Sequence, residues 1–257
     1  MKTDLGLAGA VVLVTGGVRG VGRGISDVFL AHGARVVTCA RREPETPTGA
    51  EFARCDVRDD TQVAALVDGI VDRHGRLDVV VNNAGGAPYA PAADALPRLH
   101  EKIVQLNLLA PLLVSQKANA VMQRQDGGGS IVMISSVSST RPSPGTAAYG
   151  AAKAGLDSLT ASLAVEWAPR VRVNALDVGM VRTEQAHLHY GSEAAVEAVA
   201  KTVPLGRLAE PEEVGACAAF LASGLASYVS GATLRVHGGG EVPAFLAAAD
   251  VNHREDQ

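Results

Sequence analysis

Short apolar runs alternate with longer amphipathic stretches along the chain. A run such as residues 10–14 is rich in β-branched residues and ends at glycines, which is typical of a strand buried on both faces. Strands are expected on this basis at 10–14, 35–38, 52–55, 77–81, 130–134, 171–175 and 233–236. Helices are expected between them at 22–32, 61–73, 97–123, 149–167 and 211–222.

Strands that alternate with helices predict a parallel sheet. The expected fold class is therefore α/β, a Rossmann-type doubly wound parallel sheet flanked by helices on both faces. The 257 residues, 47% of them hydrophobic, are enough for one large core, so we expect a single domain over 1–257. The connection at 42–53 is too short for a full crossover helix, and residues 241–257 are expected to form a C-terminal tail with a disordered end.

A glycine-rich loop, Thr15–Gly22, directly follows the first expected strand and opens the first expected helix. Glycines allow the backbone to turn sharply and to approach a pyrophosphate, while the helix N-terminus points free N–H groups at the phosphates. A strand-to-helix turn without a ligand is the simpler alternative. The placement between a strand and a helix favours dinucleotide binding.

The end of the second expected strand bears on the choice between NAD and NADP. At this place an acidic residue suits a free ribose 2′-hydroxyl, and an arginine suits a 2′-phosphate. The stretch Thr38–Arg42 lacks an acid but contains Arg41 and Arg42, and Arg19 in the glycine loop is a third cation. Guanidinium groups bind phosphate bidentately, so we predict NADP(H) with Arg41, helped by Arg19, as its phosphate ligand. Two alternatives remain open. Arg42 could bind the phosphate in place of Arg41, or the arginines could simply be a solvated strand end.

Tyr149 and Lys153 are candidates for proton transfer. Their four-residue spacing places them on one face of a helix, one turn apart. A free tyrosine titrates at about pH 10, and a nearby ammonium stabilises its phenolate. Ser136 follows the strand expected at 130–134, at the sheet edge that faces the ligand crevice. A Tyr/Lys pair also occurs by chance on many helices, so the combination with Ser136 carries the prediction.

With these residues taken together, the chain resembles the single-domain branch of the short-chain dehydrogenase/reductase family. The resemblance covers about 10–240 and rests on a set of motifs in order: TGGVRGVG at Thr15–Gly22, Cys55–Val57, Asn82–Gly85, Asn107, Ile134–Ser136, Tyr149 with Lys153, Val173–Asn174, Gly179 with Thr183, and Tyr228–Gly231.

The resemblance implies a role for each of these residues. Tyr149 would be the general acid in reduction, Lys153 would hold the nicotinamide ribose and lower the pKa of Tyr149, and Ser136 would donate to the substrate oxygen. Asn107 would hold a water that links Lys153 to solvent. The segment at about 183–205 would be a mobile lid. The implied cofactor-binding residues are Gly16, Arg19, Val21, Gly22, Arg41, Asp56, Val57, Asn83, Ala84, Gly85, Tyr149, Lys153, Val181 and Thr183.

Two departures from the family pattern leave every catalytic group in place. The family usually has Pro-Gly after its sixth strand, where this chain has Val178-Gly179, and it usually ends Val-Asp-Gly-Gly, where this chain has His237 in place of the acid. The short 42–53 connection and the arginine that ends the second strand are similar to some bacterial 3-oxoacyl thioester reductases of the family.

We therefore expect an NADP(H)-dependent oxidoreductase that transfers a hydride between nicotinamide and a small-molecule carbonyl or secondary alcohol, with a 3-oxoacyl thioester as one candidate substrate. A hydroxysteroid or alcohol dehydrogenase that uses NAD is an alternative. A non-catalytic cofactor-binding regulator or scaffold is another. The intact set of Asn107, Ser136, Tyr149 and Lys153 argues against a scaffold, which needs none of them.

Composition and charge bear on partners and location. The net charge of −4, with interspersed signs, gives no basic stripe for nucleic acid, and no apolar stretch is long enough to span a membrane. Three distant cysteines and the isolated pair His187 and His189 predict neither a disulfide nor a metal site. We expect a cytoplasmic protein. The helices that carry Asn107 and Tyr149 are apolar on more than one face, and relatives pair these helices, so a homotetramer is expected.

Overall fold

The computed structural model describes residues 4–248. It has one seven-stranded parallel sheet in the order β3-β2-β1-β4-β5-β6-β7, which confirms the expected Rossmann-type fold. Chain order reverses between β1 and β4, so the carboxyl ends of these strands border a crevice. The strands are β1 (Val11–Thr15), β2 (Arg35–Ala40), β3 (Glu51–Arg54), β4 (Val79–Asn82), β5 (Gly129–Ile134), β6 (Val171–Val178) and β7 (Thr233–Val236).

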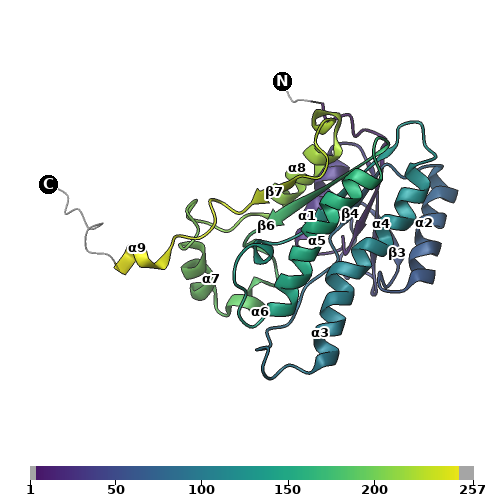
Figure 1. The fold of residues 1–257 in the computed structure, drawn as a ribbon. Coiled ribbons are helices and arrows are strands. Elements are labelled where there is room, and N and C mark those ends of the chain that lie inside the picture. Colours follow the sequence, from purple (N-terminus) through teal and green to yellow (C-terminus); the bar gives the residue numbers. More distant parts are fainter. Residues whose placement is uncertain (1–3, 249–257) are drawn as a thin grey trace.

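Helices cover both faces of the sheet. Figure 1 shows α2, α4 and α5 in front of the strands and α1 and α8 behind them. The helices are α1 (Gly20–Ala31), α2 (Asp60–His74), α3 (Pro97–Val104), α4 (Ala110–Met122), α5 (Ala147–Glu166), α6 (Ala186–Tyr190), α7 (Glu193–Ala200), α8 (Pro211–Ala222) and α9 (Ala244–Ala248). Short 3₁₀ helices lie at Val137–Ser139 and Gly224–Ala226.

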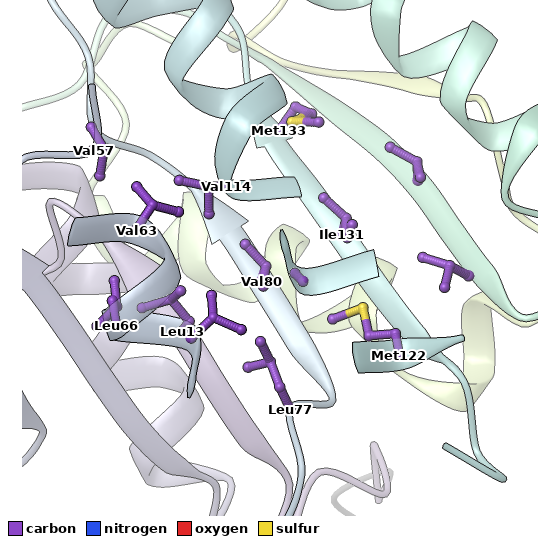
Figure 2. Packing of buried hydrophobic residues seen from close by; sticks show 14 of the residues in the cluster. Leu13, Val57, Val63, Leu66, Leu77, Val80, Val114, Met122, Ile131 and Met133 are labelled. Atoms are coloured by element: carbon purple, nitrogen blue, oxygen red, sulfur yellow. The ribbon is translucent and has the colours of Figure 1, made fainter. Parts of the chain in front are cut away.

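Alternate residues of the central strands enter two separate cores. Leu13, Val80 and Ile131 point to the face covered by α2, α4 and α5, where they pack near Val114 and Met122 (Figure 2). Their sequence neighbours enter the core beneath α1 and α8. Because both faces are buried, the strands read as continuous apolar runs, and this makes them predictable from sequence.

The single long helix expected at 97–123 is interrupted. The structure has α3, then a π-helical turn at Gln105–Leu109, then α4. Pro111 accounts for the widening, because proline has no N–H to donate to the carbonyl of Asn107 four residues earlier and its ring crowds that carbonyl. The consequence is that Asn107 lies in the π-helical turn.

β6 is longer than the expected 171–175 and runs to Val178. Val178 is the register partner of Val236 on β7. Where the family usually has proline, valine keeps the backbone N–H and suits an extended strand, so the ladder continues to this residue. Asp177 is thereby held inside the sheet, 1% exposed.

The segment at 183–205, which the family resemblance implies to be a lid, includes regular structure. It contains α6 and α7, and both histidines lie exposed on α6. Ala186, Val196 and Val203 of this segment form a small core together with Leu208, which follows the segment. Farther on, residues 244–248 of the expected tail form α9. Its expected disordered end falls within 249–257, outside the described residues.

Candidate active site

The glycine loop lies at the carboxyl end of β1 and leads into α1. Gly16 has a φ of +64°, in the left-handed region that favours glycine. A Cβ on Gly22 would overlap the carbonyl of Gly16 and the side-chain amide of Asn83. Both positions therefore require glycine, and the result is a tight turn that leaves bare backbone at the edge of the sheet.

The N-terminus of α1 faces a carboxylate from a distant segment. The backbone N–H of Gly20 donates to Glu184 Oε1 at 3.1 Å, and a Cβ on Gly20 would lie 3.5 Å from the methyl group of Thr183. The segment after β6 thus crosses directly over the end of the glycine loop. Free N–H groups and the helix dipole favour negative charge at this point.

Asn83 and Ala84 hold the end of β4 against the glycine loop. Their backbone N–H groups donate to the hydroxyl of Thr15 at 2.9 and 3.0 Å. The side-chain amide of Asn83 donates to the carbonyls of Thr15, at 2.9 Å, and Gly16. These contacts are structural, and they fix the two strand ends that border the crevice.

Several charged residues gather where β1, β2 and β3 end. Arg19 is the exposed N-cap residue of α1, and Arg41 is exposed directly after β2. Asp56, after β3, accepts from both Arg58 Nε, at 2.9 Å, and Arg58 Nη2, at 2.6 Å. The hydrogen bonds from Arg58 and the charge of Arg41 lower the pKa of Asp56. Sequence reasoning missed Arg58, although its position two residues after Asp56 was a visible signal.

Tyr149 and Lys153 lie one turn apart on α5, as expected. Lys153 Nζ is 5.5 Å from the centroid of the Tyr149 ring and donates to the carbonyl of Ile134 at 2.7 Å. Lys153 is only 3% exposed, and burial lowers its pKa to about 8. Ser136, just after β5, lies close enough to Tyr149 to lower the pKa of its phenol. The structure therefore brings Ser136, Tyr149 and Lys153 together.

The pKa of Tyr149 is shifted upward, which is opposite to the direction inferred from the Tyr149/Lys153 pair. Burial raises this pKa, and the proximity of Ser136 opposes the rise only in part. The ammonium of Lys153 is bound to the carbonyl of Ile134, and its own pKa is lowered by burial. Desolvation of the phenol therefore determines the direction, and the phenol is kept protonated.

Asn107 is fully buried, and both polar atoms of its side chain are hydrogen bonded to backbone groups. Its Oδ1 accepts from the N–H of Gly86 at 2.8 Å, and its Nδ2 donates to the carbonyls of Gly86 and Ile103, each at 2.9 Å. A Cβ on Gly85 would meet Asn107 Oδ1 at 2.7 Å and lie 3.5 Å from Lys153 Nζ. Asn107 thus joins the loop after β4 to the π-helical turn, beside the lysine.

Polar residues that sequence reasoning missed lie near Ser136, in the 3₁₀ helix that follows it and on β6. The hydroxyl of Ser139 donates to both carboxyl oxygens of the buried Asp177, at 3.2 and 3.3 Å. Ser135 donates to the carbonyl of Lys153 at 3.3 Å. An acidic residue inside the apolar run of β6 was the signal that could have identified Asp177.

Two loops meet beside this centre. The loop after β4 places the ring of Tyr89 where a Cβ on Gly145 would lie, and the N–H of Ala90 donates to the carbonyl of Gly145 at 2.7 Å. Between residues 138–144 and α5 there is a cavity of about 430 Å³. An ion pair joins Arg141 of this loop to Glu241.

Two further findings concern residues 4–248. They contain no group of three or more His, Cys, Asp or Glu side chains arranged to hold a metal ion. No helix in the same range has both the length and the apolar character needed to cross a membrane.

Comparisons with known proteins agree with this geometry. The model of a family described as Enoyl-(Acyl carrier protein) reductase matches residues 16–241. The chain is 38% identical to an L-fucose dehydrogenase of Oryctolagus cuniculus over 94% of this chain and 88% of that protein. It is 36% identical to an uncharacterised short-chain type dehydrogenase/reductase of Sinorhizobium fredii over 90% of this chain, but spans only 43% of that protein.

A solved structure supports the same grouping. The aldohexose dehydrogenase of Thermoplasma acidophilum superposes with a TM-score of 0.88 at 32% identity, over 92% of this chain and 96% of that one. Fold, site geometry and these matches agree. The chain therefore belongs to the short-chain dehydrogenase/reductase family and is an oxidoreductase of that type, which uses a nicotinamide cofactor.

Proposed function

We propose that the protein interconverts a carbonyl and a secondary alcohol with NADP(H), and that Tyr149 is the general acid or base. The observation that supports this most is the grouping of Ser136, Tyr149 and Lys153 at the sheet edge that also carries the glycine loop. The bare backbone of Gly16 and Gly22 fits a dinucleotide, because a side chain there would fill the turn.

Each residue has a distinct task in the proposed reaction. The nicotinamide supplies or accepts the hydride when bound. In reduction, the hydroxyl of Tyr149 donates its proton to the carbonyl oxygen, and burial keeps this phenol protonated until then. Ser136 donates a hydrogen bond to the same oxygen as negative charge develops. The buried ammonium of Lys153 stabilises the phenolate that remains.

The preference for NADP(H) is supported by charge at the adenosine end. Arg41 follows β2, Arg19 caps α1, and no acidic residue ends β2 to receive a free 2′-hydroxyl. Both arginines are exposed, and neither has a salt bridge within the described residues. Arg42 remains the alternative phosphate ligand, and NAD the alternative cofactor.

Two substrate classes are proposed. A 3-oxoacyl thioester is supported by the short 42–53 connection and by the description of the matching family model. A polyhydroxylated substrate is supported by the names of the fucose and aldohexose dehydrogenases, and by a group of hydroxyls beside α5. In that group Ser143 Oγ lies 2.6 Å from Thr146 Oγ1 and 3.2 Å from Ser138 Oγ.

The experiment that tests this function is a matrix of two cofactors and a panel of carbonyl and alcohol substrates. Purified protein is assayed with NADPH and NADH against acyl thioesters and simple ketones, and with NADP⁺ and NAD⁺ against aldoses, alditols and hydroxysteroids. Turnover with an NADP(H) preference is expected. Cofactor binding without turnover of any tested substrate would favour the regulator or scaffold. Faster turnover with NAD(H) would contradict the proposed cofactor.

We also propose a cytoplasmic homotetramer. Val165 on α5 is 81% exposed and Leu109 in the π-helical turn is 51% exposed, so the helices that carry the catalytic groups present apolar side chains outward. A second copy would cover such side chains. Light scattering at micromolar concentration should give the mass of four chains, and the mass of one chain would contradict this proposal.

A further inference from the structure

An acidic side chain lies beside the arginine that is proposed to bind the 2′-phosphate. The backbone N–H of Cys55 donates to the carbonyl of Ala40 at 3.0 Å, one residue beyond the end of β3. Arg41 and Asp56 are the next residues along these two neighbouring segments. Paired strands lie about 4.8 Å apart, so the two side chains start from adjacent points of the same sheet edge.

The carboxylate of Asp56 is held by a single residue. It accepts three hydrogen bonds from Arg58: one from the backbone N–H at 3.1 Å, one from Nε at 2.9 Å and one from Nη2 at 2.6 Å. Within residues 4–248 these are all the hydrogen bonds that this carboxylate accepts. The guanidinium engages both carboxylate oxygens, so the negative charge of Asp56 is directed toward Arg58 and largely offset there.

The loop that carries this pair has other supports. The backbone N–H of Asp56 donates to Gln62 Oε1 at 2.9 Å, and its carbonyl accepts from the N–H of Asp59 at 3.0 Å. Asp59 in turn caps α2, where it accepts from the backbone N–H of Gln62 at 3.1 Å. Because these contacts hold the backbone, removal of the Arg58 side chain should free the carboxylate of Asp56 without displacing the loop.

Arg41 is in the opposite situation, because it is exposed and has no salt bridge within the described residues. A carboxylate of Asp56 that is released from Arg58 would face Arg41 across the two strand ends. It would pair with this guanidinium and would also repel a 2′-phosphate bound there. An acid at this place suits a free 2′-hydroxyl instead.

We propose that Arg58 determines the choice of cofactor by restraining Asp56, which keeps Arg41 available for the 2′-phosphate of NADP(H). Arg58 acts through Asp56 and is a positioning residue, not a catalytic one. The inference rests on the proposed binding of the 2′-phosphate at Arg41. It adds a second requirement for NADP(H), because the lack of an acid at the end of β2 is effective only while the acid after β3 is restrained.

The test measures the Kd of NADPH and of NADH for the purified full chain without substrate, by cofactor fluorescence. Arg58→Met should lower the ratio of Kd for NADH to Kd for NADPH by about tenfold, the loss expected for one exposed charge-assisted hydrogen bond at Arg41. Adding Asp56→Asn to Arg58→Met should restore the ratio to near its wild-type value, because no carboxylate is left to pair with Arg41. Any contact of Asp56 with the adenine is common to both cofactors and cancels in the ratio.

Two results would overturn the proposal. One is an unchanged ratio in Arg58→Met. The other is a lowered ratio that Asp56→Asn does not restore, since Arg58 would then bind the phosphate itself. Arg76→Met is the matched control, because Arg76 makes the same bidentate pair with Asp78 at the amino ends of the strands, directly before β4, and should leave the ratio unchanged.

Failure of this inference can be distinguished from failure of the proposed cofactor. The wild-type ratio alone tests the preference for NADP(H), and a value below one would contradict that preference. The change of the ratio between wild type and Arg58→Met tests the role of Arg58, whatever the wild-type value is. Should Arg58→Met fail to fold, Arg58→Gln takes its place in the same comparison.

Discussion

The two sides of the crevice are built in different ways. On the β1–α1 side, backbone and glycine contacts dominate, such as the close approach of Gly22 to Gly16 and the amides of Asn83 and Ala84 on Thr15. On the β5–α5–β6 side, buried polar side chains dominate, with Lys153 on a carbonyl and Ser139 on Asp177. The first side is a fixed surface, whereas the second is a set of titratable groups.

This difference predicts two kinds of sensitivity. Added volume should damage the glycine side, because close-packed backbone cannot move aside. Added or removed protons should damage the tyrosine side, because buried groups are held in defined protonation states. The four predictions that follow test the distinction, from the largest effect to the smallest.

Tyr149→Phe should leave cofactor affinity near wild type and reduce kcat by roughly 100- to 10,000-fold, since it removes one proton-transferring hydroxyl and keeps the ring. Steady-state kinetics and a cofactor titration measure the two effects. Tyr228→Phe is the control, because Tyr228 is fully exposed and should tolerate the change. Wild-type turnover in Tyr149→Phe would assign the proton transfer to another group.

Gly22→Ala should affect stability and cofactor affinity rather than proton transfer. One methyl group placed against the Gly16 carbonyl and the Asn83 amide should cost about 1–3 kcal/mol, which is seen as a lower melting temperature and weaker NADPH binding. Gly69→Ala in α2 is the matched control, because only the flexible end of Arg73 lies near the new methyl group, at 3.3 Å. An equal response of the two variants would mean that the glycine loop is not tightly packed.

Arg41→Ala should reduce the NADPH preference by about tenfold, as expected for one exposed charge-assisted hydrogen bond of roughly 1.5 kcal/mol. Arg19→Ala should have a similar effect, and the double variant about 100-fold. The ratio of kcat/KM for NADPH and NADH measures this. If only Arg42→Ala loses the preference, Arg42 and not Arg41 binds the phosphate.

Glu184→Gln should tighten NADPH binding by roughly two- to fivefold. The carboxylate accepts from Gly20 at the N-terminus of α1, where it competes with the cofactor phosphates for the same donors and repels them. Glu166→Gln, at the exposed C-terminal end of α5, should change nothing. Weaker binding in Glu184→Gln would show that Glu184 helps to hold the cofactor.

The two sides also differ in how well they could be predicted from sequence. Runs of buried strand residues and the glycine loop are local patterns, and so is the spacing of Tyr149 and Lys153, which is why they were identified. The π-helical turn depends on Pro111 acting within a longer helix, which periodicity does not reveal. The contacts of Glu184 with Gly20 and of Ser139 with Asp177 join segments distant in the chain.

The direction of the tyrosine pKa could not be predicted for a related reason. Spacing places Lys153 beside Tyr149, but the shift depends on burial of both groups and on the carbonyl of Ile134, which only the fold supplies. Local pattern therefore identifies the reacting residues, and tertiary packing determines their protonation.

Transfer of deuterium from NADPH labelled at the reactive nicotinamide carbon tests the central claim most directly. Wild-type protein is mixed in single turnover with labelled NADPH and each carbonyl substrate of the panel, and the product is analysed by mass spectrometry. We predict one deuterium in the alcohol product with wild type, and unimpaired NADPH binding with little labelled product in Tyr149→Phe. Tight NADPH binding by wild type with no label in any product, or equal labelling by Tyr149→Phe, would contradict it.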